Sequence, residues 1–314
     1  SKPPLYHWIG YCFSLFLGEA DEFCIRLPSL LFATGTLLLT MYLGYLIFAG
    51  GARDGSGKLS RADCRTAQDV GLLSGMILST TYGFVRMSID ARVDMTFCFF
   101  VCAALFPVLV RLAWVDPYTR NAGRILRERD FVWFYLWSAF AVLAKGPLGL
   151  VLPAVIVFSI LCYLYGWHIA LRVCLRPRWG WVLLLVVALP WYLGAALRGN
   201  DAFIWRQVVF ENLLRVAGAD FINSEAWWFY LPSVFRTGAP WTWVAALLLG
   251  LQWLRNAKCA GMVRVQEHCQ RVRHMPLVWF IVGIVLFSIP SGKRHSYMLP
   301  LLPGIAIWCA TALS

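Results

Sequence analysis

The chain has 314 residues, of which 60% are hydrophobic and 14% charged, whereas soluble domains have about 45–50% apolar and about 25% charged residues. This composition excludes a disordered chain and an ordinary soluble enzyme, and it indicates a protein that crosses a membrane several times. The net charge of +12 fits either nucleic-acid binding or basic cytoplasmic loops. Because the charges gather between apolar runs, we expect membrane lipids and no nucleic acid as partners.

Residues 1–28 are expected to form an external segment, which we separate from a transmembrane domain of residues 29–314. The apolar run from Leu5 to Leu17 has 13 residues, too few for a membrane span, which needs about 20. Its aromatic residues, among them Trp8 and Tyr11, are typical of a helix that lies in the membrane plane. The segment therefore predicts an outer interfacial helix.

Apolar runs along the rest of the chain predict an all-α, polytopic membrane protein with about nine transmembrane helices. The turn residues Lys145-Gly146-Pro147 separate the fourth run from the fifth, and the alternative is one long kinked helix. The largest external loop is predicted at about 198–230. The predicted spans are 29–50, 70–88, 94–113, 131–144, 147–165, 180–197, 233–254, 276–290 and 298–314.

The basic residues predict which loops face the cytoplasm. If the spans alternate, one side carries 17 of the 28 Lys and Arg residues, and the positive-inside rule assigns that side to the cytoplasm. Merging the fourth and fifth runs into one span weakens this bias, so two spans are favoured. The order places Ser1 outside, and we therefore expect an earlier span upstream of it. The predicted cytoplasmic loops are 51–69, 111–130, 166–179 and 255–275.

Several cations remain on the outer side, close to the ends of apolar runs. Charges near the hydrocarbon are costly and often functional, and a group of cations suits a lipid phosphate or pyrophosphate. The alternative is that each side chain only extends to the headgroups. These residues are Lys2, Lys145, Arg215, Lys293 and Arg294.

Asp94 opens the third apolar run, where a carboxylate is not needed for solubility. One interpretation makes it a general base, a metal ligand or a group that orients a sugar hydroxyl. The other makes it a helix N-cap, a position that aspartate favours. The sequence leaves both open. No two histidines have metal-ligand spacing, and no nucleotide-binding or zinc-protease motif occurs.

Short motifs along nearly the whole chain resemble one family of membrane enzymes. They are Ser-Lys-Pro-Pro-Leu-Tyr-His-Trp at 1–8, Arg-Leu-Pro-Ser at 26–29, Ala-Arg-Val-Asp-Met at 91–95, Ala-Lys-Gly-Pro-Leu-Gly at 144–149, Leu-Pro-Trp-Tyr at 189–192, and Ser-Gly-Lys-Arg-His-Ser-Tyr-Met-Leu-Pro-Leu-Leu-Pro at 291–303. In this order they resemble the bacterial GT-C glycosyltransferases, closest to the lipid A aminoarabinose transferase and dolichyl-phosphate-mannose protein mannosyltransferase-like family.

The resemblance implies an enzyme of the bacterial inner membrane that works at its outer face. Such enzymes move a sugar from a polyprenyl-phosphate carrier to a lipid or protein acceptor. By position, Lys2, Arg215 and Tyr297 match residues around the carrier phosphate, and Asp94 matches an acidic residue of the site. The family's main acidic motif lies upstream of Lys-Pro-Pro, and a glutamate proposed to bind a divalent metal commonly stands where this chain has Ser1. We therefore assign no cofactor and leave a divalent metal open.

Two other classes of function remain to be compared with glycosyl transfer. A secondary transporter would place polar residues and broken helices near the middle of the membrane, whereas the unusual polar groups here lie at the outer ends of the predicted spans. A lipid-binding protein without enzymatic activity is the third class. Transfer from a polyprenyl-phosphate sugar donor separates the first class from the other two.

Overall fold

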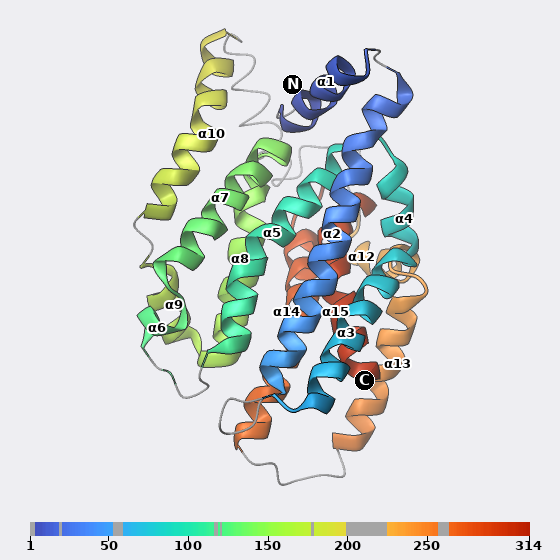
Figure 1. Ribbon diagram of the computed structural model, residues 1–314, viewed down its shortest axis with the longest axis vertical. Helices are drawn as coiled ribbons and strands as arrows, with labels where there is room; N and C mark the ends of the chain where they lie inside the picture. Colours follow the sequence, from blue (N-terminus) through green and yellow to red (C-terminus); the bar gives the residue numbers. More distant parts are fainter. Residues whose placement is uncertain are drawn as a thin grey trace.

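The computed structural model shows a bundle of helices (Figure 1). It describes residues 4–18, 21–52, 59–115, 119, 121–176, 179–198, 225–256 and 264–314. Every regular element within these ranges is a helix, which confirms the all-α prediction. The helices are α1 (Leu5–Leu17), α2 (Glu22–Gly51), α3 (Arg61–Ser79), α4 (Tyr82–Ile89), α5 (Val93–Trp114), α6 (Ala122–Ile125), α7 (Glu128–Lys145), α8 (Leu148–Tyr165), α9 (Trp167–Cys174), α10 (Trp179–Arg198), α12 (Tyr230–Thr237), α13 (Trp241–Asn256), α14 (Arg264–Ser288), the 3-10 helix η2 (His295–Leu301) and α15 (Leu302–Leu313).

Helix α1 forms over the run that predicts an interfacial helix. It exposes Tyr11 and Phe16, while the Tyr6 hydroxyl donates a hydrogen bond of 2.6 Å to the carbonyl of Ile25 at the start of α2. The fold thus contains the predicted helix. Its position in the membrane plane and the division at residue 28 remain predictions. Most of the predicted 198–230 loop lies outside the described residues.

Six helices of the described part are long and apolar enough to cross a membrane: α2, α5, α8, α10, the last 20 residues of α14, and η2 with α15. The bent pair of α12 and α13 raises this number to seven if the pair forms one span. The chain is therefore a multi-pass membrane protein. The predicted count of nine is not confirmed.

Two predicted spans are broken where a continuous helix was expected. The run at 70–88 divides into α3 and α4 at Thr80 and Thr81, whose hydroxyls turn back to the carbonyls of Met76 and Ile77 at 2.7 Å. The run at 233–254 bends by 109° between α12 and α13, where Pro240 has no amide hydrogen to continue a helix.

The two breaks lie against each other and supply each other's hydrogen bonds. The Tyr82 amide donates to the carbonyl of Ala239 at 2.9 Å, and the Trp241 indole donates to the Thr80 hydroxyl at 2.8 Å. Interruptions inside a membrane are tolerated when neighbouring segments satisfy the freed backbone groups. The hydropathy pattern identifies both runs but does not reveal this mutual support.

The turn predicted at Lys145-Gly146-Pro147 is confirmed. Helix α7 ends at Lys145 and α8 begins at Leu148. Gly146 has a φ of 87°, a left-handed conformation that side chains other than hydrogen disfavour, and its amide donates to the Val142 carbonyl at 2.8 Å. The long kinked helix is therefore excluded.

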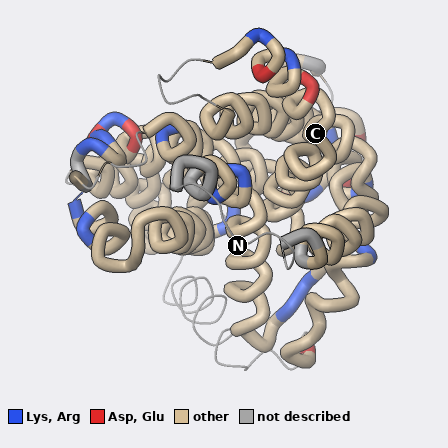
Figure 2. The backbone as a smooth tube through the Cα atoms, turned by 90° about the horizontal axis from the view of Figure 1, so that it is seen from below, with Lys and Arg blue, Asp and Glu red and all other residues tan. Residues whose placement is uncertain are grey.

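The ends of the bundle follow the predicted alternation. In Figure 1, α6 and α9 lie toward the same lower end as the C-terminal ends of α2 and α13, whereas α1 lies at the opposite end. Figure 2, seen from below, shows blue and red segments at several helix ends and long tan stretches between them. The grouping of loops is thus consistent with the prediction, and which end faces the cytoplasm stays a prediction.

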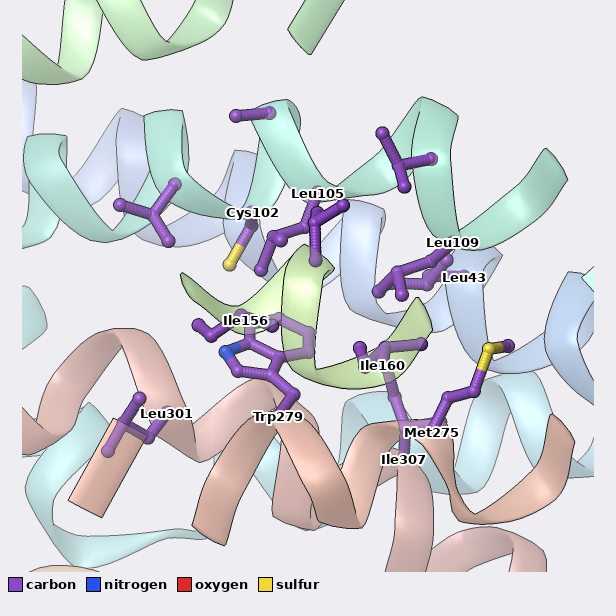
Figure 3. Close-up of a cluster of buried hydrophobic side chains, with 14 of the residues drawn as sticks. Leu43, Cys102, Leu105, Leu109, Ile156, Ile160, Met275, Trp279, Leu301 and Ile307 are labelled. Atoms are coloured by element: carbon purple, nitrogen blue, oxygen red, sulfur yellow. The ribbon is translucent and has the colours of Figure 1, made fainter. Parts of the chain in front are cut away.

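The interior is apolar and joins helices from both halves of the chain. Figure 3 shows Trp279 of α14 lying among Leu105 of α5, Ile156 of α8 and Leu301 of η2, all fully buried. Cys98 and Cys102 of α5 are also buried, as their place in an apolar run predicts. This core fixes the starts of α5 and η2 next to each other.

Candidate active site at the outer end of α5, α7 and η2

Asp94 and Lys145 form an ion pair between α5 and α7. The side chains are 13% and 16% exposed, respectively, so water covers little of either charge. Asp94 lies in the first turn of α5, and the residue at the N-cap is Arg92. The N-cap interpretation of Asp94 is therefore wrong. The acid instead neutralises a lysine that lies at the end of another helix.

Tyr297 and Phe97 complete the surroundings of the Lys145 ammonium. Its nitrogen lies 4.6 Å from the ring centroid of Tyr297 and 5.1 Å from that of Phe97. A cation at this distance is attracted by the negative face of an aromatic ring. The structure thus brings together two of the predicted phosphate-binding residues, Lys145 and Tyr297, with Asp94. We call Asp94, Phe97, Lys145 and Tyr297 the outer cluster.

The backbone around Tyr297 is held in place by α5 and α14. Helix η2 lies on the start of α5, where the Cys98 thiol donates to the Leu299 carbonyl at 3.6 Å. The Tyr297 ring also packs against Phe287 of α14, with 5.5 Å between the centroids. These contacts position the phenol without any help from Lys145.

Lys293 and Arg294 lie in the same loop but contact other groups. Lys293 is only 5% exposed, and its ammonium donates to the Glu225 carbonyl at 3.0 Å. The Arg294 side chain is exposed, while its backbone amide and carbonyl both bond to the Tyr230 hydroxyl, at 3.3 and 3.2 Å. Both residues therefore connect the loop to the segment that begins α12. Their predicted contact with a phosphate remains a prediction.

The N-terminal segment reaches the start of α5 through a chain of hydroxyl groups. The Tyr6 hydroxyl lies 3.4 Å from the Ser29 hydroxyl, which in turn donates to the Arg92 carbonyl at 3.4 Å. Arg92 precedes α5 by one residue. The two remaining predicted phosphate ligands, Lys2 and Arg215, lie outside the described residues.

Two aromatic residues, one in the cluster and one near it, were not predicted as site residues. Phe97 follows Asp94 by three positions, so the helical period places both on one side of α5. Tyr192 of α10 lies beside the α7–α8 turn, since its hydroxyl would be 3.8 Å from a Cβ on Gly146. The hydroxyl is buried and has no hydrogen-bond partner among the described residues. The Leu-Pro-Trp-Tyr motif is the only sequence signal that marks it.

The described residues contain no group of three or more His, Cys, Asp or Glu side chains arranged to hold a metal ion. The divalent metal left unassigned from the sequence therefore gains no ligand set in this part of the chain.

Curated relatives of the chain are mostly named as aminoarabinose transferases. An undecaprenyl phosphate-alpha-4-amino-4-deoxy-L-arabinose arabinosyl transferase of Pseudomonas fluorescens is 29% identical over 214 residues, which cover 66% of this chain and 33% of the relative. A protein of the same name from Proteus mirabilis is 25% identical over 322 residues, covering 98% of this chain and 49% of the relative. The chain thus spans half or less of the length of these relatives. No protein-family model matches it.

Solved structures show the same fold. The crystal structure of ArnT from Cupriavidus metallidurans bound to undecaprenyl phosphate superposes with a TM-score of 0.71 at 21% identity, covering 99% of this chain and 50% of that one. The apo form of the same protein gives a TM-score of 0.70. This chain is similar in sequence to undecaprenyl phosphate aminoarabinose transferases and has the fold of ArnT.

Proposed function

We propose that the protein transfers aminoarabinose from undecaprenyl phosphate to lipid A at the outer face of the bacterial inner membrane. The observation that carries this proposal is the outer cluster, where a shielded ammonium is held between a carboxylate and the face of a tyrosine. It lies at the end of the bundle opposite the predicted cytoplasmic loops. The names of the relatives supply the sugar and the carrier.

The reaction requires stabilisation of a leaving phosphate. The bond between the sugar's anomeric carbon and the carrier phosphate oxygen breaks, with its electron pair going to that oxygen. The anomeric carbon bonds to an acceptor oxygen, and the acceptor's proton passes to the departing phosphate. Negative charge grows on the phosphate oxygen as the bond breaks. A cation held ready in a site with little water stabilises that charge without first having to be ordered.

Lys145 is the described cation best placed for this task. Its ammonium has three donors, of which Asp94 takes one in the structure. The remaining donors are free to meet a phosphate oxygen beside the Tyr297 ring. We propose that Lys145 and Tyr297 act on the donor phosphate together with Lys2, Arg215 and Lys293, which the sequence assigns to it.

Asp94 acts in this proposal by holding Lys145. Its Oδ1 accepts a hydrogen bond from the Lys145 ammonium, so the carboxylate is engaged in holding the lysine. We therefore propose that Asp94 is a positioning residue, and not the general base that the sequence leaves open. Arg294 keeps its exposed side chain available for the same headgroup region.

The proposal is tested by transfer in reconstituted vesicles. The purified protein is supplied with a synthetic undecaprenyl-phosphate aminoarabinose donor and lipid A, and the modified lipid A is quantified by mass spectrometry. Wild type should form product, and Lys145→Met should be about 100-fold slower, the usual effect of losing one group that stabilises the transition state. Gly194→Ala on α10, where nothing lies within 4 Å of the added methyl group, should keep the wild-type rate.

A folded wild-type protein that forms no product from this donor would contradict the proposal. Movement of the donor lipid across the vesicle membrane, without product, would instead support the transporter class.

A further inference from the structure

Helix α9 turns sharply away from the end of α8. Gly166, between the two helices, has a φ of 84°, so the chain changes direction there and α9 does not continue the span. Figure 1 shows α9 on the outside of the bundle, next to α6. Ala170 and Val173 are buried and attach one side of α9 to the other helices.

The opposite half of α9 and the two residues that follow it carry two different stripes. Trp167, Leu171 and Leu175 follow each other at intervals of four residues and are 60%, 43% and 78% exposed. The neighbouring stripe, again at intervals of four, consists of His168, Arg172 and Arg176, all exposed. Residues four apart lie on one side of a helix. The apolar stripe therefore adjoins the side of the helix that faces the bundle, and the basic stripe lies farther from the bundle.

Helix α6 adds further positive charge beside α9. Arg124, Arg127 and Arg129 are exposed on α6 and at the start of α7. Their backbone is fixed from α5, because the Arg111 guanidinium donates to the carbonyls of Arg124 at 2.6 Å and Ile125 at 3.2 Å. Of the two nearby acids, Asp130 is buried and its carboxylate accepts a hydrogen bond from the Arg127 amide at 2.9 Å. Glu128 is exposed, so three arginines stand against one exposed carboxylate and the segment stays basic.

We propose that α9 and α6 form a binding surface for the headgroups of anionic phospholipids at the end of the bundle opposite the outer cluster. An exposed apolar stripe beside a basic stripe is the pattern of a helix that lies in a membrane interface. The apolar stripe enters the acyl region, and the arginines bind headgroup phosphates. An arginine near an anionic surface strengthens binding about fivefold, so the stripe distinguishes anionic from zwitterionic lipid.

The test compares thermal stability in nanodiscs of defined lipid. The protein is reconstituted in phosphatidylcholine with 0, 10 or 30% phosphatidylglycerol, and its melting temperature is measured at low and high salt. Wild type should melt at higher temperature as phosphatidylglycerol increases, and 1 M salt should remove most of the rise. In phosphatidylcholine alone, Arg172→Gln/Arg176→Gln should melt at the wild-type temperature. When phosphatidylglycerol is added, its melting temperature should rise by at most half as much as that of wild type.

Arg61→Gln/Arg65→Gln provides the matched control. Both arginines are exposed on α3, near the same end of the bundle, so this variant removes equal charge and should keep the full rise. An equal loss in both variants would show that only the overall basic charge matters, and would overturn the assignment to α9. A wild type insensitive to phosphatidylglycerol would overturn it as well. The glycosyl-transfer activity does not enter either measurement.

Discussion

Removing one partner of the Asp94–Lys145 pair should destabilise the protein more than removing both. The Asp94 and Lys145 side chains are 13% and 16% exposed, so the charged group that remains after one partner is removed is poorly hydrated. Loss of one partner of a buried pair costs about 3–5 kcal/mol, and we expect about 3 kcal/mol for Asp94→Asn because some solvent remains. Asp94→Asn/Lys145→Met leaves no lone charge and should cost about 1 kcal/mol.

The measurement is the free energy of unfolding in mixed micelles titrated with denaturing detergent. The exposed pair of Glu22 and Arg26 on α2 is the control. Because exposed pairs contribute about 0–1 kcal/mol, Glu22→Gln should change the stability by less than about 0.5 kcal/mol. Equal stability of Asp94→Asn and wild type would refute the claim that the pair is shielded.

The same variants separate a positioning role of Asp94 from a base. If Asp94 acts only through Lys145, the double variant should transfer sugar at the rate of Lys145→Met, about 100-fold below wild type. A general base contributes about 10²–10⁴-fold of its own, so its loss would slow the Lys145→Met background by at least another factor of about 100. Additive losses would therefore refute the positioning role.

Three further predictions use other parts of the chain. A membrane-impermeant thiol reagent applied to intact cells should label exposed Cys12. It should miss the cysteines of the predicted cytoplasmic loops, and labelling of Cys64 would refute the predicted sidedness. Burial raises the pKa of the Cys174 thiol to about 11, and because only the thiolate reacts, its labelling in permeabilised cells should rise about tenfold per pH unit below that pKa. Gly146→Ala should destabilise the protein by about 1–2 kcal/mol because of its positive φ, whereas Gly194→Ala should not. The cysteines that the impermeant reagent should not label on intact cells are Cys64, Cys174, Cys259 and Cys269.

Local patterns predict the helices well because each span has to satisfy its own backbone in lipid. The apolar runs therefore locate both ends of α5, α8 and α10 closely, whereas α2 begins at Glu22 and not at the predicted residue 29. Breaks inside an apolar run cannot be predicted in this way, because the backbone groups freed at a break are hydrogen-bonded by a segment far away in sequence. The bond between Tyr82 and the Ala239 carbonyl is such a case, and no window of hydropathy contains both residues.

The polar residues of the outer cluster stand out in the sequence, but their pairing and the aromatic member Phe97 do not. Cations and an acid at the outer ends of apolar runs are unusual in any sequence, and this singled out Asp94, Lys145 and Lys293. Nothing in their spacing says that Asp94 meets Lys145 across 51 positions. The spacing likewise does not reveal that the Lys293 ammonium donates a hydrogen bond to the backbone carbonyl of Glu225.

In the proposed function, the pairing with Asp94 keeps Lys145 at the edge of the hydrocarbon until an anionic lipid binds. An unpaired ammonium there would be costly, and a lone carboxylate equally so. Together, Asp94 and Lys145 are neutral, and the tyrosine face takes up part of the remaining field of the cation. In the proposed function, Lys145 keeps its contact with Asp94 and gains a second contact with the donor phosphate, so no free side chain has to be ordered when the lipid binds. Lys293 has no such carboxylate among its described partners, and its charge is therefore less compensated than that of Lys145 until an anion binds.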